Sequence, residues 1–138
     1  MRVAAIELRL ERAGRFLGYR GAPLLLPSGW QAWNAYQAGA LVGSLAVACG
    51  PAGRFDWDEA DYEGPFFASG APPAALDPAS AVARLECVYI APSLRGGALW
   101  QRYAALLAAL RLPVYASFAS PRLRERFWSA HRHGGHAH

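Results

Sequence analysis

The stretch "LECVYIAPSLRGGALWQRY", residues 85–103, changes its pattern halfway along and thereby decides the fold. Its apolar first part predicts the end of a strand, and Pro92, Arg95 and the pair Gly96-Gly97 interrupt that strand. From Ala98 onward the sequence favours a helix, whose apolar face would comprise Leu99, Tyr103, Leu106, Leu107 and Leu110. Since residues 112–120 again form a short apolar run, residues 82–118 predict a β-α-β unit with parallel strands and a right-handed crossover.

The flanking segments add antiparallel strands and a second helix. Residues 3–10 alternate as a strand, residues 14–27 suggest a loop with one extended piece, and residues 30–48 predict a β-hairpin turning at Ala38-Gly39. Residues 50–80 suggest a long loop, and Ser120-Pro121 would open a helix. The fold class is therefore α/β (α+β), with a mixed, mostly antiparallel sheet, a central β-α-β unit and helices packed on it.

Length and composition favour one domain over residues 1–130, followed by a His/Gly-rich tail over residues 131–138. The chain has 138 residues, of which 54% are hydrophobic and 17% charged. Its longest apolar run, residues 39–50, is too short to span a bilayer, and the N-terminus lacks the apolar block of a signal peptide. We therefore expect a cytoplasmic protein without membrane contact.

All fourteen Lys-or-Arg positions are Arg, and the net charge is +4. The absence of Lys excludes a P-loop and Schiff-base chemistry. The arginines are dispersed except in residues 122–127, where they are typical of a solvated helix face, so nucleic-acid binding is disfavoured.

Neither the cysteines nor the histidines predict a metal cofactor. Cys49 and Cys87 lie in apolar, strand-like segments, where a free thiol usually packs in a core, and a disulfide between them is disfavoured in the cytoplasm. Four histidines near the C-terminus could chelate a transition metal, but a mobile tail is the favoured interpretation. They are His131, His133, His136 and His138.

The order of elements and residues 85–103 together resemble the GNAT superfamily of acyl-CoA-dependent N-acetyltransferases, over about residues 28–130. In that family a strand often reads Leu-Glu-x-x-aromatic-Val-x-Pro and is followed by a loop beginning with Arg or Gln. The matching residues here are Leu85, Glu86, Tyr89, Ile90, Pro92 and Arg95. The hairpin "AGALVGSLAV" is similar to the family's third strand. The resemblance implies a GNAT-like sheet and acetyl-CoA (coenzyme A) as cosubstrate.

The resemblance implies that residues 95–99, at the start of the predicted helix, hold the cofactor's pyrophosphate. The first N–H groups of a helix have no intrahelical partners and carry partial positive charge, so they attract phosphate, and Arg95 would add a charged donor. The resemblance implies cofactor contacts from eight residues: Val88, Tyr89, Ile90, Arg95, Gly96, Gly97, Ala98 and Leu99. The sequence departs from the family at Trp100, where a small residue is usual.

The resemblance also assigns Glu86 as the general base that removes a proton from the attacking amine. A structural carboxylate, solvated or paired with Arg84, is the alternative. The family's acid is a Tyr where this chain has Trp128, and an indole does not titrate usefully. Tyr115 or Tyr89 could replace it, although core positions are the more ordinary interpretation.

An acidic cluster lies between the predicted third and fourth strands, in the region that borders the acceptor pocket of the family. Asp56, Asp58, Glu59 and Asp61 would attract a cationic amine; a solvated loop is the alternative. Trp57, Tyr62, Phe66 and Phe67 interleave with the acids, which suggests that the loop packs against something, for instance a partner chain. Homo-oligomerisation is left open.

The sequence therefore predicts an N-acetyltransferase that moves an acetyl group from acetyl-CoA to a primary amine. The alternative is a catalytically inactive GNAT-like protein with a structural or interaction role, such as a bacteriophage component.

Overall fold

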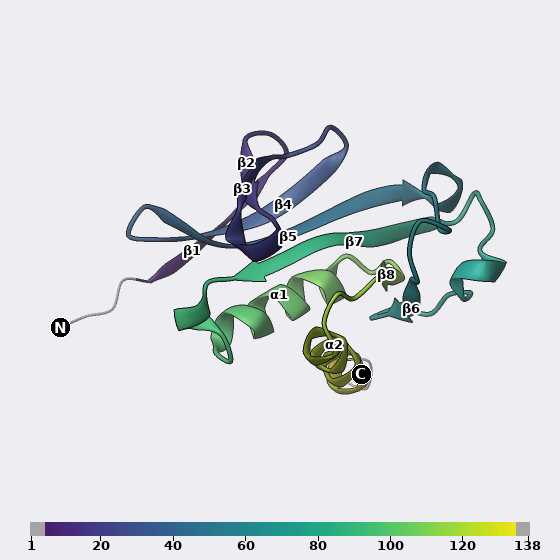
Figure 1. The fold of residues 1–138 in the computed structure, drawn as a ribbon. Coiled ribbons are helices and arrows are strands. Elements are labelled where there is room, and N and C mark those ends of the chain that lie inside the picture. Colours follow the sequence, from purple (N-terminus) through teal and green to yellow (C-terminus); the bar gives the residue numbers. More distant parts are fainter. Residues whose placement is uncertain (1–4, 135–138) are drawn as a thin grey trace. The chain divides into compact units, whose positions relative to one another are not determined.

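The computed structural model describes residues 5–134, which form eight strands and two α-helices (Figure 1). The strands are β1 (Ile6–Glu11), β2 (Arg15–Leu17), β3 (Pro23–Leu25), β4 (Trp30–Gln37), β5 (Ala40–Pro51), β6 (Glu63–Phe66), β7 (Ala81–Ile90) and β8 (Val114–Ala116). The helices are α1 (Ala98–Ala109) and α2 (Pro121–Gly134). Single 3-10 turns, Tyr19–Gly21, Ala52–Arg54, Pro73–Ala75 and Pro92–Leu94, stand between strands or before α1.

Six strands form a mixed, mostly antiparallel sheet in the order β1-β4-β5-β7-β8-β6, and β2 and β3 form a separate two-stranded sheet. The pair β7–β8 is parallel, with Ala83 opposite Val114 and Arg84 opposite Tyr115, which confirms the predicted parallel strands around α1. The hairpin β4–β5 is also confirmed. It turns at Ala38 and Gly39, whose φ angles of 50° and 81° suit a tight hairpin turn.

Three segments differ from the sequence prediction. Residues 14–27 contain two paired strands, β2 and β3, where one extended piece was expected. The long loop over residues 50–80 contains β6, which pairs with β8. Helix α2 continues to Gly134, so residues 131–134, which the sequence prediction placed in the tail, belong to the helix.

The chain divides into two compact units that interleave along the sequence. The first comprises Met1–Ala48 and Glu86–Trp100, and the second comprises Cys49–Leu85 and Gln101–His138. In the first unit Phe16 of β2 packs on Ala32 and Ala46 of the β4–β5 hairpin. A buried polar pair reinforces this contact: Ser44 donates to the Asn34 side-chain oxygen at 2.6 Å and accepts from the Leu17 backbone N–H at 2.8 Å.

The second unit has two apolar clusters. Ala52, Val82 and Tyr115 form one, and Phe55, Trp57 and Leu76 pack against it. The other is aromatic. Phe66 of β6 contacts Phe127 and Trp128 of α2, with ring centroids 5.6 Å and 4.6 Å away. Helix α2 is thus held to β6 by its aromatic face.

Candidate functional site

The turn that joins β7 to α1 has the features expected of an anion-binding site. The 3-10 turn Pro92–Leu94 ends β7 and is followed by Arg95 and the two glycines. Gly96 has a φ of +81°, a left-handed conformation that glycine adopts without strain. Helix α1 begins at Ala98, so the N–H groups of its first turn lack intrahelical acceptors.

Solvent reaches this turn directly. Arg95, Gly96, Gly97 and Ala98 are all exposed, and a β-carbon added at Gly96 would meet no atom within 4 Å. Leu99 differs from them, because its side chain is only 2% exposed and belongs to the core. It could therefore offer only its backbone to a ligand. Trp100, the departure from the family pattern, is half-buried.

Two contacts orient the Arg95 guanidinium. Its Nε donates to the Ile90 carbonyl at 2.8 Å, and its Cζ lies 5.5 Å from the centroid of the Tyr89 ring. The terminal nitrogens make no bond or ion pair within the described part of the chain, so they remain available to an anion. A fixed guanidinium with free terminal donors suits a phosphate ligand.

Strand β7 carries the remaining residues that the sequence assigned to the cofactor and to catalysis. Its register with β8 ends at Arg84, because β8 is only three residues long. Glu86, Val88 and Tyr89 follow and are half-buried, and Ile90 is buried.

The thiol next to Glu86 is half-buried and lies against β2. Burial, and secondarily the charge of Glu86, raise the pKa of the Cys87 thiol. Cys87 Sγ lies 3.7 Å from the Leu17 carbonyl, to which the protonated thiol can donate. Both cysteines are free.

The acidic loop folds onto Arg84, which the sequence analysis considered only as a possible partner of Glu86. The Arg84 side chain is 11% exposed, and its Nη1 contacts Glu59 Oε1 at 3.1 Å and the Asp56 carbonyl at 3.0 Å. Phe55 and Tyr62 lie against the guanidinium at 5.0 Å and 5.2 Å. The aromatic residues at positions 55, 57 and 62 therefore pack around an arginine of their own chain.

The four predicted acceptor-binding acids do not share one environment. Glu59 is paired with Arg84 and also accepts from the Tyr62 hydroxyl at 2.7 Å. The Asp56 carboxylate accepts the Asp58 backbone N–H at 2.9 Å, which stabilises the turn. The side chains of Asp58 and Asp61 are exposed and are the acids best placed to meet a cationic ligand.

Neither Trp128 nor Tyr115 is available as an acid for the leaving thiolate. The indole N–H of Trp128 lies 3.3 Å from Glu63 Oε1, and the indole packs on Phe66. Tyr115 is fully buried, burial raises its pKa, and its hydroxyl donates to the Ala71 carbonyl at 2.5 Å. Tyr89, with its ring beside Arg95, is half-buried.

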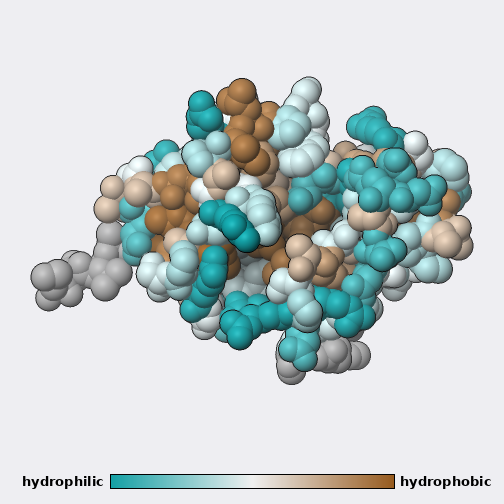
Figure 2. All heavy atoms as spheres, in the orientation of Figure 1, coloured by the Kyte–Doolittle hydropathy of each residue, from teal (hydrophilic) through white to brown (hydrophobic). Residues whose placement is uncertain are grey.

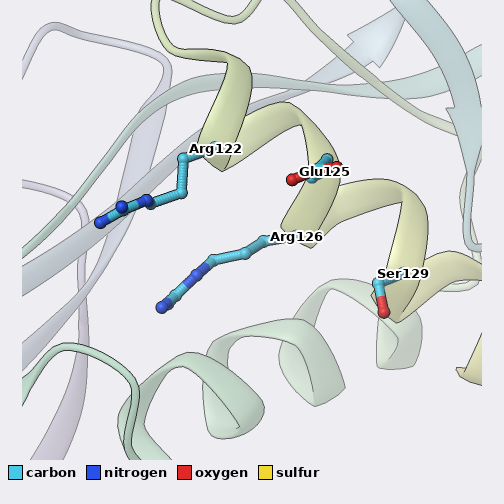
Figure 3. Close-up of a pocket in the computed structure, with 4 residues that line it drawn as sticks. All are labelled: Arg122, Glu125, Arg126 and Ser129. Atoms are coloured by element: carbon cyan, nitrogen blue, oxygen red, sulfur yellow. The ribbon is translucent and has the colours of Figure 1, made fainter.

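A hollow of about 470 Å³ lies along α2 and is lined by Arg122, Glu125, Arg126 and Ser129. Figure 3 shows Arg122 and Arg126 extending in the same direction from successive turns of the helix. Neither arginine has an ion pair within the described residues, whereas Arg124 on the same helix binds Glu63 at 2.7 Å. The sequence predicted a solvated helix face for these arginines. The spacing of four residues between Arg122 and Arg126 already indicated that both lie on the same face of the helix.

Of the four histidines considered as metal ligands, only His131 has a side chain that the structure describes. His131 Nδ1 accepts the Phe67 backbone N–H at 2.8 Å, so this imidazole supports the contact of α2 with the segment after β6. The side chains of His133, His136 and His138 lie outside the described residues. Over residues 5–134 no group of three or more His, Cys, Asp or Glu is arranged to hold a metal ion.

No protein-family model, curated protein or solved structure matches this chain. Neither helix of the described region has the length and apolar character needed to cross a bilayer.

Proposed function

We propose that this protein binds acetyl-CoA at the turn formed by residues 91–98 and transfers the acetyl group to a primary amine. The observation that carries the proposal is the exposed start of α1 beside a guanidinium with free terminal nitrogens. A pyrophosphate at this position would accept from the first-turn N–H groups and from Arg95. The resemblance to the GNAT superfamily supports the choice of coenzyme A as the phosphate-bearing ligand.

In the proposed reaction, the neutral amine attacks the thioester carbonyl and the carbon–sulfur bond breaks. The nitrogen loses its proton to Glu86, directly or through water, and coenzyme A departs as a thiolate. A thiol has a pKa of about 8.5, so the thiolate is a competent leaving group that can take its proton from water. The reaction therefore does not require Trp128 or Tyr115 as an acid.

The acceptor best suited to the remaining acidic groups is a cationic amine. Asp58 and Asp61 are exposed, whereas Glu59 is already neutralised by Arg84. A polyamine or a peptide rich in basic residues would gain from these two exposed carboxylates through long-range attraction. Such a contribution falls with ionic strength.

A second function, a GNAT-like scaffold that acts by interaction alone, is favoured by one specific observation. The aromatic groups that could assist chemistry are used internally: Trp128 contacts Glu63, and the Tyr115 hydroxyl binds Ala71. A scaffold would keep the fold of the turn while losing turnover.

Two measurements on the full chain separate these functions. Acetyl-CoA at a hundred times its Kd should stabilise the folded protein by about 2.7 kcal/mol, seen as a rise in melting temperature. Free thiol release with a panel of amines then reports transfer. Stabilisation with thiol release supports the transferase, stabilisation without release supports the scaffold, and no stabilisation at millimolar acetyl-CoA contradicts cofactor binding.

A further inference from the structure

The hairpin β2–β3 presents large apolar side chains to solvent. Tyr19, Leu24 and Leu25 are 72%, 46% and 69% exposed, and they lie within seven residues of one another. Figure 2 shows hydrophobic atoms protruding where Figure 1 places this hairpin. Single exposed apolar residues are ordinary, but a cluster of this kind on one short element indicates a contact surface.

The hairpin is firmly attached, so this exposure does not reflect a loose segment. Phe16 is 4% exposed within the core of the first unit, and the Leu17 N–H donates to Ser44 Oγ at 2.8 Å. At the other end of the hairpin, a β-carbon on Gly21 would lie 2.8 Å from the Tyr89 hydroxyl oxygen. The apolar side chains are therefore displayed by an element whose base is packed.

The charged side chains between Arg12 and Leu25 are all arginines. Arg12, Arg15 and Arg20 are exposed and have no ion pair within the described residues, and Arg20 lies 5.2 Å from the Tyr19 ring centroid. Between Glu11 and Asp56 the sequence contains no acidic residue. The surface is therefore complementary to an anionic partner.

The geometry of β3 distinguishes between kinds of partner. Leu24 and Leu25 are consecutive in a strand, so their side chains leave opposite faces, and both are exposed. A protein partner that covers one face would leave the other leucine in water. Addition of a strand to β3 is disfavoured, because β3 has three residues and begins with Pro23. A second copy would bring arginines against arginines.

We propose that the hairpin β2–β3 docks onto membranes that contain anionic phospholipids. Tyr19, Leu24 and Leu25 enter the interfacial layer, which can cover both faces of the outer strand β3, and Arg12, Arg15 and Arg20 meet lipid phosphates. This proposal departs from the sequence expectation of no membrane contact, which rested on the absence of a spanning segment and of a signal peptide. The docking goes beyond acetyl transfer and does not depend on it.

The test is co-sedimentation of the full chain with phosphatidylcholine vesicles, with and without about 30 mol % phosphatidylserine. We expect sedimentation with the anionic vesicles that weakens as salt is added, and at least about tenfold weaker binding of Leu24→Ser/Leu25→Ser, because two exposed leucines lose their lipid contact. Arg15→Gln/Arg20→Gln should bind about thirtyfold more weakly, since each of the two arginines near an anionic surface contributes about 1 kcal/mol. The matched control Arg54→Gln/Arg111→Gln removes two exposed arginines elsewhere and should bind as the wild type does.

Three results would overturn the proposal. They are no sedimentation of the wild type with either vesicle, unchanged binding of the leucine variant, and a wild-type dimer in light scattering that the leucine variant converts to a monomer without any vesicle binding. The last would make the hairpin an interface between copies. Both leucines are exposed, so the variants should keep the wild-type melting temperature, which verifies that they are folded.

Discussion

The acidic loop and the turn before α1 each carry an arginine, and the two arginines are used in opposite ways. Arg84 is nearly buried, bound to Glu59 and to a backbone carbonyl, and surrounded by aromatic rings. Arg95 is exposed and fixed through one nitrogen, and its terminal nitrogens are free of protein partners in the described chain. The first arrangement stabilises the fold, whereas the second leaves donors for a ligand. Resemblance to a family cannot distinguish these cases, but burial and hydrogen bonding can.

Replacement of Arg84 should have the largest effect of the changes considered. Arg84→Ala removes a charge-assisted hydrogen bond, an ion pair and the cation–aromatic contacts, so we expect a loss of about 3 kcal/mol in the free energy of unfolding. Chemical denaturation measures this loss. Glu59→Gln is the matched control, and it should cost less than about 1 kcal/mol because Glu59 is half-exposed. A loss at Arg84 no larger than that at Glu59 would contradict the role of Arg84 in closing the loop.

Replacement of Arg95 should do the reverse. Arg95→Ala is expected to change the free energy of unfolding by less than about 1 kcal/mol, since the residue is exposed and one hydrogen bond is lost. The same change should weaken acetyl-CoA binding about tenfold or more, because a charged phosphate contact disappears. Isothermal titration measures the affinity, with Arg111→Ala as an exposed control. Equal affinities for Arg95→Ala and the control would remove Arg95 from the site.

The pair of Glu63 and Arg124 should give a smaller effect that depends on pH. Hydrogen bonding to Arg124, with a further contribution from Trp128, lowers the pKa of Glu63. A carboxyl group whose pKa is lower in the folded state stabilises the fold above its ordinary pKa of about 4.5 and loses this contribution as the pH falls through the lowered value. Glu63→Gln should therefore reduce stability at pH 7 by about 1 kcal/mol or less, and the difference from wild type should vanish in acid. A difference that persists in strong acid would contradict this assignment.

The smallest effect on stability is expected at Asp58 and Asp61, the two exposed acids of the loop. Asp58→Asn/Asp61→Asn should leave the free energy of unfolding within about 0.5 kcal/mol of the wild type, since both side chains are exposed. If a cationic amine is the acceptor, the double variant should have a higher KM for it than the wild type has, when both are measured at low ionic strength. The KM for a neutral amine should be the same in both proteins. Unchanged KM values for both amines would exclude the loop from acceptor binding.

The sequence predicted the β-α-β unit correctly because its signals are local: an apolar strand, a Pro/Gly turn and a helix with one apolar face. Leu99, Tyr103 and Leu107 of that face are buried as expected. Strand β6 was missed because its four residues include Gly64 and Pro65, which disfavour a strand, and only pairing with β8 holds them extended.

The candidate site was predictable only in part. The exposed turn at Arg95 and the glycines followed from a motif within a few residues, whereas the closure of the acidic loop did not. Arg84 and Glu59 are far apart in sequence, and no periodicity marks their contact. The cross-strand partners Asn34 and Ser44 were missed for the same reason, since a buried polar pair becomes visible only once the register of β4 and β5 is known.

The most direct test of the central claim is isothermal titration of the full chain with acetyl-CoA, followed by the same titration with pantetheine, the part of coenzyme A that carries no phosphate. Phosphates held at the start of α1 predict measurable binding of acetyl-CoA, at least about tenfold weaker binding of the compound without phosphates, and loss of this difference in Arg95→Ala. Absence of heat at millimolar acetyl-CoA, or equal affinity for the two compounds, would contradict the proposed site.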